Sequence, residues 1–212
     1  MKKIDTRGIT YLQAFEGLEQ WYWGTDYSCG DLYEAEEVFR SGEEFQPNRL
    51  IFVEYPSGQV YEPMQAAKGQ YFGEPSCIDG EIYFLFVDFA KGVIGVYVFL
   101  QNTKAMQLHA EIPISEVEDC YNLKIDGSPM MVTRQGGENR FQVIWPEKVD
   151  FAMEERSGFM FRKGEKLYFS MWHEDPDYRE EIHIRAYPSG KLLEIIDGSA
   201  MRMPNGERWV LA

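Results

Sequence analysis

The tetrapeptide Tyr55-Pro56-Ser57-Gly58 occurs twice in this chain, the second time as Tyr187-Pro188-Ser189-Gly190. An extended run comes before each copy, at residues 50–54 and 182–186, and another follows at 59–62 and 191–194. Because Pro and Gly favour tight turns between extended segments, each copy predicts a β-hairpin. The chain therefore contains at least two similar β-units.

Equivalent hairpins recur at a nearly constant spacing. With Tyr55 as the marker, the next equivalents are Gln101, Trp145 and Tyr187, at intervals of 46, 44 and 42 residues. Extended runs that follow a glycine at 80–86 and 164–169 support the same register, with less exact copies at 127–132 and 206–211. About four strands in some 44 residues is the size of one propeller blade.

The repeat predicts an all-β fold of four-stranded units of about 44 residues, propeller-like, with four to five blades. We expect a single domain over residues 1–212, with units at about 9–66, 67–113, 117–155 and 157–197 and closing strands at 199–212. The closing strands would pair with N-terminal strands and close a ring, which we favour, or leave an open stack of sheets.

Residues 186–194, which read Ala-Tyr-Pro-Ser-Gly-Lys-Leu-Leu-Glu, resemble the outer hairpin of many β-propeller repeats. The resemblance covers about ten residues in each unit. Similar turns occur in repeated-hairpin proteins of bacterial antitoxin-like families, and the chain has neither a WD dipeptide nor a kelch double glycine where those families need one. The resemblance implies an architecture and identifies no single family.

Composition limits the partners and the compartment. The net charge of −14 and the pI near 4.7 disfavour nucleic acid and anionic membrane surfaces, which bind basic proteins. No run approaches 18 apolar residues, and the N-terminus lacks the apolar region of a signal peptide. The chain has three cysteines, Cys29, Cys77 and Cys120. Their odd number and wide spacing indicate reduced thiols. We expect a cytoplasmic protein without a cofactor.

One acidic segment, residues 31–40, interrupts the strand pattern. Leu32, Ala35 and Phe39 stand at helical spacing with glutamates, including Glu36 and Glu37, between them. The segment predicts a short helix or a decorated loop inserted in the first unit.

Residues 19–27 hold an aromatic cluster, with Trp21, Trp23 and Tyr27 near carboxylates. Such rings can stack on a ligand such as a sugar, and paired carboxylates could cleave a glycosidic bond. In a strand, however, Trp21 and Trp23 share one face, so packing between sheets also explains them. Both interpretations stay open at this point.

The densest group of potential metal ligands lies at residues 172–183. His173, Asp175, Asp177 and His183 could converge on a divalent ion. An acidic hairpin loop around Pro176 is the simpler interpretation, because the segment lies between two expected strands.

The sequence favours binding over catalysis, since it has no nucleophile elbow and no phosphate-binding loop. We expect a cytosolic binding or scaffolding module that recognises a protein or peptide through loops of the repeat ring. The expected contacts are the inserted acidic segment from Asp31 to Glu44, with Glu36 and Glu37, and the neighbouring Trp21, Trp23 and Tyr27. The alternative is a small-molecule or carbohydrate binder, or less readily a hydrolase, that uses the aromatic and carboxylate cluster.

Overall fold

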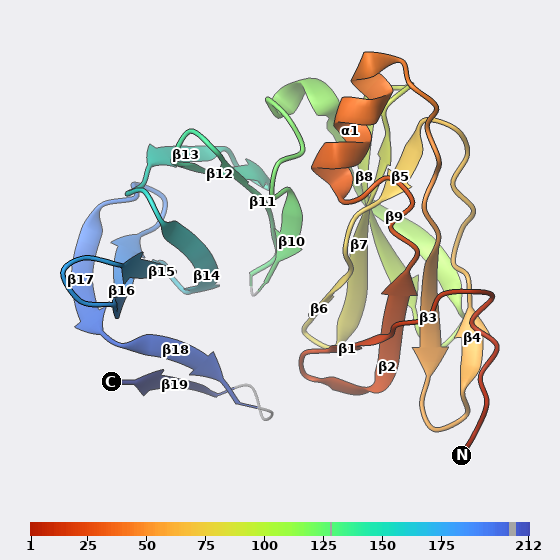
Figure 1. Ribbon diagram of the computed structural model, residues 1–212, viewed down its shortest axis with the longest axis horizontal. Coiled ribbons are helices and arrows are strands. Elements are labelled where there is room, and N and C mark those ends of the chain that lie inside the picture. Colours follow the sequence, from red (N-terminus) through yellow and green to blue (C-terminus); the bar gives the residue numbers. More distant parts are fainter. Residues whose placement is uncertain (128, 204–206) are drawn as a thin grey trace. The chain divides into compact units, whose positions relative to one another are not determined.

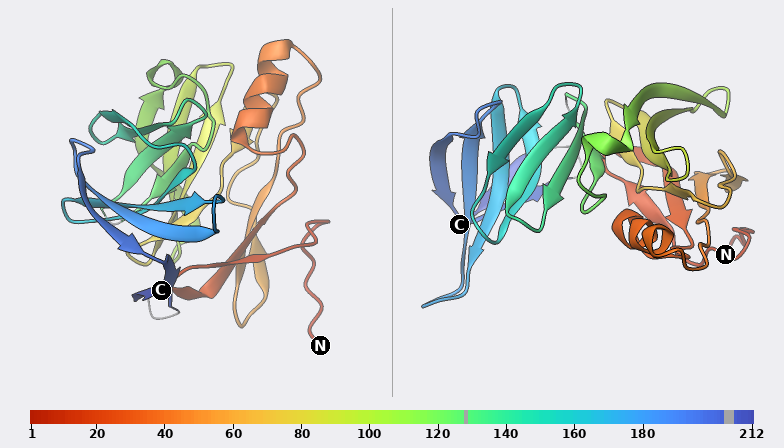
Figure 2. Two further views of the ribbon diagram at one scale, coloured as in Figure 1. Left: turned by 60° about the vertical axis from the view of Figure 1, so that its left-hand side comes forward. Right: turned by 90° about the horizontal axis from the view of Figure 1, so that it is seen from above.

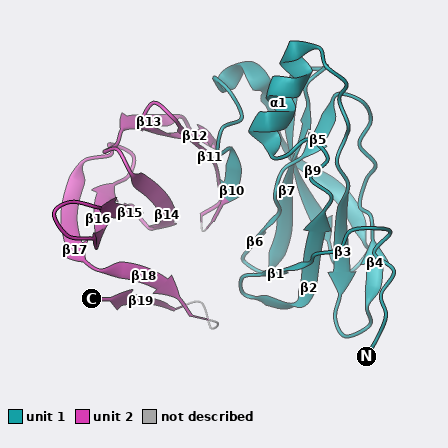
Figure 3. Ribbon diagram, in the orientation of Figure 1, with its two compact units in different colours: residues 1–125 teal, residues 126–212 magenta. Residues whose placement is uncertain are grey.

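The computed structural model describes residues 1–127, 129–203 and 207–212 (Figure 1). Ser128 and residues 204–206, which fall within expected strand runs, lie outside the described residues. The chain divides into two compact units, Met1–Ile125 and Asp126–Ala212, coloured separately in Figure 3. The expectation of one domain over residues 1–212 stays a prediction.

Unit 1 holds two antiparallel sheets and one α-helix. The first sheet has the strand order β1-β2-β3-β4, with β1 at Gln13–Phe15, β2 at Leu18–Thr25, β3 at Leu50–Glu54 and β4 at Gln59–Tyr61. The second has the order β5-β7-β8-β9, with β5 at Gln70–Phe72, β7 at Glu81–Asp88, β8 at Val93–Leu100 and β9 at Ala105–Pro113. Strand β6, Ser76–Ile78, also pairs with β7, and a 3₁₀ turn follows β9 at Ile114–Glu116.

Unit 2 is also built mainly of antiparallel sheets. One sheet has the order β10-β11-β12-β13, at Lys124–Asp126, Met131–Gly136, Arg140–Trp145 and Val149–Ala152, and its first strand begins in unit 1 with Lys124 and Ile125. The next has the order β14-β15-β16-β17, at Ser157–Lys163, Lys166–His173, Arg179–Ala186 and Leu192–Asp197. A two-stranded sheet of β18, Ser199–Arg202, and β19, Arg208–Leu211, ends the chain.

The prediction of an all-β, propeller-like fold is confirmed, with four blade-like antiparallel sheets. The four markers each stand at the end of the third strand of a sheet, where the hairpin to the fourth strand begins; they are Tyr55, Gln101, Trp145 and Tyr187. The turn is closed in the same way in the two exact copies of the tetrapeptide. The backbone N–H of Gly58 donates to the carbonyl oxygen of Glu54, and that of Gly190 donates to the carbonyl oxygen of Ala186. Closure of a ring by the last strand stays a prediction.

Side chains from facing sheets form the cores. In unit 1 the core between the first two sheets is aromatic; it includes Phe15, Trp21, Trp23, Phe52, Phe72, Phe84, Phe86 and Phe99. In unit 2 the equivalent core between sheets β10–β13 and β14–β17 includes Met131, Phe141, Val143, Phe159, Leu167 and Phe169. This follows from strand alternation, which points every second side chain of a strand to the same face.

The acidic segment forms a helix, α1, at Leu32–Ser41 (Figure 2). Asp31 and Glu34 make a capping box at its start, because each side chain accepts the backbone N–H of the other at 2.9 Å. Gly42 ends it in the left-handed region at φ 74°. Its buried face packs beside the second sheet, with Phe39 stacked on Phe89 at 5.5 Å between ring centroids. The helix prediction is confirmed.

Candidate functional site

Trp21 and Trp23 are core residues of β2. They are 2% and 5% exposed, and the Trp21 ring packs edge-on against Phe99 at 5.2 Å between centroids. The Lys104 ammonium lies 4.4 Å from the centroid of the Trp21 ring and pairs with Glu54 at 2.8 Å. Neither tryptophan lines either of the two hollows beside Tyr27 that are described next, and packing between sheets explains their alternation.

Tyr27, the third member of the aromatic cluster, is 42% exposed and is not part of that core. Its hydroxyl donates to Oε1 of Glu74 at 3.0 Å. Desolvation of the hydroxyl, followed by the negative charge of Glu74, raises the pKa of Tyr27 to about 12. Tyr27 lines two neighbouring hollows of unit 1, of about 300 and 260 Å³. Of the three aromatic candidates, this is the one whose position suits contact with a ligand.

The two glutamates of α1 have opposite environments. Glu36 is 2% exposed; its Oε2 accepts the backbone N–H of Cys120 at 2.6 Å, and its Oε1 pairs with Arg40 at 2.6 Å. Burial, followed by the neighbouring Glu36, raises the pKa of the Cys120 thiol. Glu37 is exposed and accepts a hydrogen bond from Tyr33, which raises the pKa of that tyrosine. Glu36 is therefore a structural residue, and Glu37 alone remains available to a partner.

The expected metal ligands do not form the expected site. His173 and His183 meet at one carboxylate, Glu181, whereas Asp175 and Asp177 lie exposed on the loop between β15 and β16. Across the ranges 1–127, 129–203 and 207–212, no group of three or more His, Cys, Asp or Glu side chains is suited to hold a metal ion. The structure thus has a hydrogen-bonded polar network here in place of the four-ligand site.

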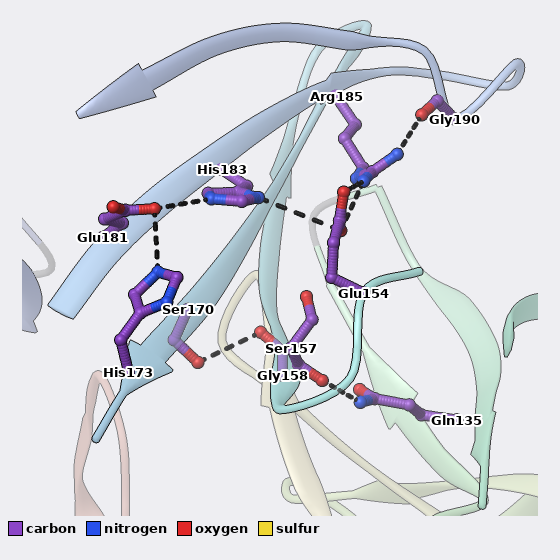
Figure 4. Close-up of polar contacts among 10 residues, drawn as sticks. All are labelled: Gln135, Glu154, Ser157, Gly158, Ser170, His173, Glu181, His183, Arg185 and Gly190. Atoms are coloured by element: carbon purple, nitrogen blue, oxygen red, sulfur yellow. Dashed lines mark hydrogen bonds and ion pairs between the residues drawn. The ribbon is translucent and has the colours of Figure 1, made fainter. Parts of the chain in front are cut away.

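That network begins at Glu181 (Figure 4). Nε2 of His183 donates to its Oε2 at 3.0 Å, and Nε2 of His173 lies 3.2 Å from the same oxygen. Contacts with His183 first, then with His173, lower the pKa of the Glu181 carboxyl to about 2. On its other side, Nδ1 of His183 lies 3.9 Å from Oε2 of Glu154.

Glu154 and Arg185 extend the network to the β16–β17 turn (Figure 4). The Arg185 guanidinium is almost fully buried and donates to both carboxylate oxygens of Glu154. It also donates to the carbonyl of Gly190 at 2.7 Å. The network therefore joins the loop after β13, strand β16 and the turn that leads into β17.

Exposed apolar side chains are concentrated on strands β17, β18 and β19. These side chains are Leu192, Leu193, Ile195, Met201, Trp209, Val210 and Leu211, which are 37–52% exposed. Elsewhere in the described residues, large exposed apolar side chains are scattered, as Leu108 is on β9. Concentrated apolar exposure of this kind marks interaction sites.

Strand β17 combines this exposure with an open edge. It is the last strand in the order β14-β15-β16-β17, and no described strand pairs with its outer side. Its inner edge pairs with β16, the strand that carries the network residues His183 and Arg185. Ile195 lies opposite His183, and Leu192 lies opposite Arg185. The network thus supports the strand that carries the exposed residues.

Neither the exposed strand nor the polar network is evident from the sequence, for two reasons. Leu192 and Leu193 were part of the hairpin motif, but a motif does not tell which side chains the fold leaves uncovered. A signal was present, since residues 192–196 read Leu-Leu-Glu-Ile-Ile and lack the polar alternation of an ordinary exposed strand. Glu154, Glu181 and Arg185 come from different elements, and only the sheet register brings them together.

No helix in the described part of the chain combines the length and apolar character needed to cross a membrane. The chain matches no protein-family model and no curated protein.

Proposed function

We propose that this protein is a non-enzymatic binding module that pairs an extended segment of a partner protein with the open edge of β17. The observation that carries the proposal is the exposure of Leu193 and Ile195, at 50% and 49%, on an edge strand. An exposed apolar edge offers unpaired backbone groups and apolar contacts together, which is the basis of recognition by strand addition.

Charge indicates the chemistry of the partner segment. The exposed strand carries Glu194 and Asp197, and the chain as a whole has a net charge of −14. A segment that alternates apolar residues with Lys or Arg would satisfy both the apolar contacts and these carboxylates. A second copy of the chain is disfavoured, because pairing of β17 with itself would bring like charges together.

The edge is held in place before a partner arrives. Strand β17 pairs with β16 over five residue pairs, and Arg185 fixes the turn that precedes β17 through Gly190. A preformed strand loses less conformational entropy on binding than a flexible loop does. This favours β17 over the loop contacts expected from the sequence.

The proposal keeps the cytosol as the compartment, since Cys29, Cys77 and Cys120 are all free thiols. It moves the contact from the acidic helix to β17. From the sequence, we expected a partner to contact the acidic segment. Glu37 is an exposed glutamate of that segment, on α1, so a variant at Glu37 tests this alternative.

A displayed library of random twelve-residue peptides tests the proposal with the full-length chain. We expect enrichment of sequences that alternate apolar residues with Lys or Arg. The double variant Leu193→Thr, Ile195→Thr keeps side chains that favour strands. It should bind the enriched peptides at least about tenfold more weakly, which is equivalent to about 1.4 kcal/mol of binding free energy.

Two control variants locate the effect. Leu108→Thr changes an equally exposed leucine, 46%, on β9 and should leave binding unchanged. Glu37→Lys alters the acidic helix and should also have little effect. Enriched peptides that lose affinity for Glu37→Lys but retain it for the double variant would contradict the proposal.

A further inference from the structure

A second candidate site lies in unit 1. It is the larger of the two hollows that Tyr27 lines, with a volume of about 300 Å³. Its walls come from four stretches of chain that are distant in sequence: residues 25–32, Asn48, residues 72–74 and residues 120–124. The volume falls at the lower end of the range for small-molecule sites.

Buried hydrogen bonds fix these walls. Asn48 is 2% exposed; its Nδ2 donates to the carbonyl of Phe72 at 2.9 Å, and its Oδ1 accepts the Phe72 N–H at 2.7 Å. On another side, the bond from the Cys120 N–H to Glu36 holds the start of residues 120–124 against helix α1. The hollow is therefore formed before any ligand binds, which lowers the entropy lost on binding.

The lining carries charges of both signs. Asp31 and Glu74 contribute carboxylates, each of which accepts one of the hydrogen bonds described above, from Glu34 and Tyr27 respectively. A carboxylate has about four acceptor positions, so both retain capacity for a ligand cation. Lys124 contributes an ammonium group that forms no ion pair with any described residue.

Apolar side chains complete the lining, with Leu32 and Leu123 each 6% exposed. A ligand that suits this lining has an amine, an anionic group and a small apolar body. We propose that the hollow binds a free α-amino acid with an apolar side chain. The amine binds at Asp31 and Glu74, the carboxylate at Lys124, and the side chain against Leu32.

Calorimetric titration of the full-length chain tests this with glycine, alanine, leucine and phenylalanine as probes. Leucine or phenylalanine should bind more tightly than glycine, because they add apolar contacts. Two analogues of leucine separate the charges: leucinamide lacks the carboxylate, and isocaproate lacks the amine. Each should bind at least about tenfold more weakly than leucine, since each loses a charged contact.

Two variants assign the charged groups. Lys124→Gln should still bind leucine, with the same affinity as leucinamide, a result that mere loss of structure would not give. Glu74→Gln should bind leucine and leucinamide more weakly than the unchanged protein does, by the same factor for both. Glu43→Gln, an exposed carboxylate outside the lining, should behave as the unchanged protein does.

The inference would be overturned if no probe bound at concentrations up to about 10 mM, a limit that corresponds to less than about 3 kcal/mol of binding free energy. It would also be overturned if leucinamide or isocaproate bound as tightly as leucine. If the Lys124→Gln variant still preferred leucine over leucinamide as strongly as the unchanged protein does, the role of Lys124 would be rejected.

Discussion

His173 and His183 share one carboxylate oxygen, since their Nε2 atoms lie 3.2 and 3.0 Å from Oε2 of Glu181. Strand pairing explains the contact: Glu181 and His183 point to the same face of β16, and His173 is at the end of the neighbouring β15. The same face leads through Arg185 to the turn before β17. The polar network therefore has a structural role beneath the proposed binding strand.

The first prediction concerns pH. The pKa of Glu181 is about 2 in the folded chain against an ordinary value of 4.5. Its charge therefore stabilises the folded state above about pH 4.5, and this stabilisation is lost as the pH falls toward 2. The free energy of unfolding should differ most between the unchanged chain and Glu181→Gln near pH 6, and the difference should shrink in acid.

Urea unfolding at a series of pH values from about 6 to 3 measures this difference. Asp177→Asn, a change on the exposed loop, is the control and should leave the pH dependence of stability unaltered. A difference for Glu181→Gln that grows as the pH falls would contradict the account.

A second prediction separates the two helix glutamates. Glu36→Ala leaves the buried N–H of Cys120 without its acceptor, so we expect a loss of about 1–3 kcal/mol in the free energy of unfolding. Glu37→Ala changes an exposed side chain and should stay within about 0.5 kcal/mol. Denaturant unfolding compares the two, and equal losses would show that Glu36 has no special structural role.

The third prediction is that the cost of replacing a tryptophan depends on whether its side chain is buried, as Trp21 is, or exposed, as Trp209 is. Trp21→Ala removes a core ring and should destabilise the chain by about 3–5 kcal/mol. Trp209→Ala, at a side chain that is 52% exposed, should cost far less. If thermal unfolding showed the opposite order, the assignment of Trp21 to the core would fail.

A fourth prediction tests the close approach of the N-terminal segment to β2. A Cβ on Gly24 would lie 2.7 Å from the carbonyl oxygen of Tyr11, so the backbone would have to move. Gly24→Ala should therefore lose about 1–3 kcal/mol of stability. Gly137→Ala has no atom within 4 Å of the added Cβ and is the matched control; a comparable loss there would reject the steric explanation.

Much of the fold could be predicted because its signals are local. The turn at Tyr55 and its copy at Tyr187 encode hairpins within a few residues, and Leu32, Ala35 and Phe39 encode α1 by spacing. Local patterns do not reveal burial, since Trp21 and Glu36 have residue types common in binding sites but lie in the interior.

The candidate sites could not be predicted in the same way. The network joins Glu154 to Arg185, and the hollow joins Tyr27 to Lys124, through contacts that depend on the packing of separate strands. The exposure of Leu193 depends on which strand is left at the edge of its sheet. Such relationships follow from tertiary structure and leave only weak traces in sequence.

The most direct test of the central claim is hydrogen–deuterium exchange of the full-length chain with and without a peptide enriched from the library. Pairing with the open edge predicts slower exchange in β17, residues 192–197, and unchanged exchange in α1, residues 32–41. Protection of α1 without protection of β17 would contradict strand addition at this edge.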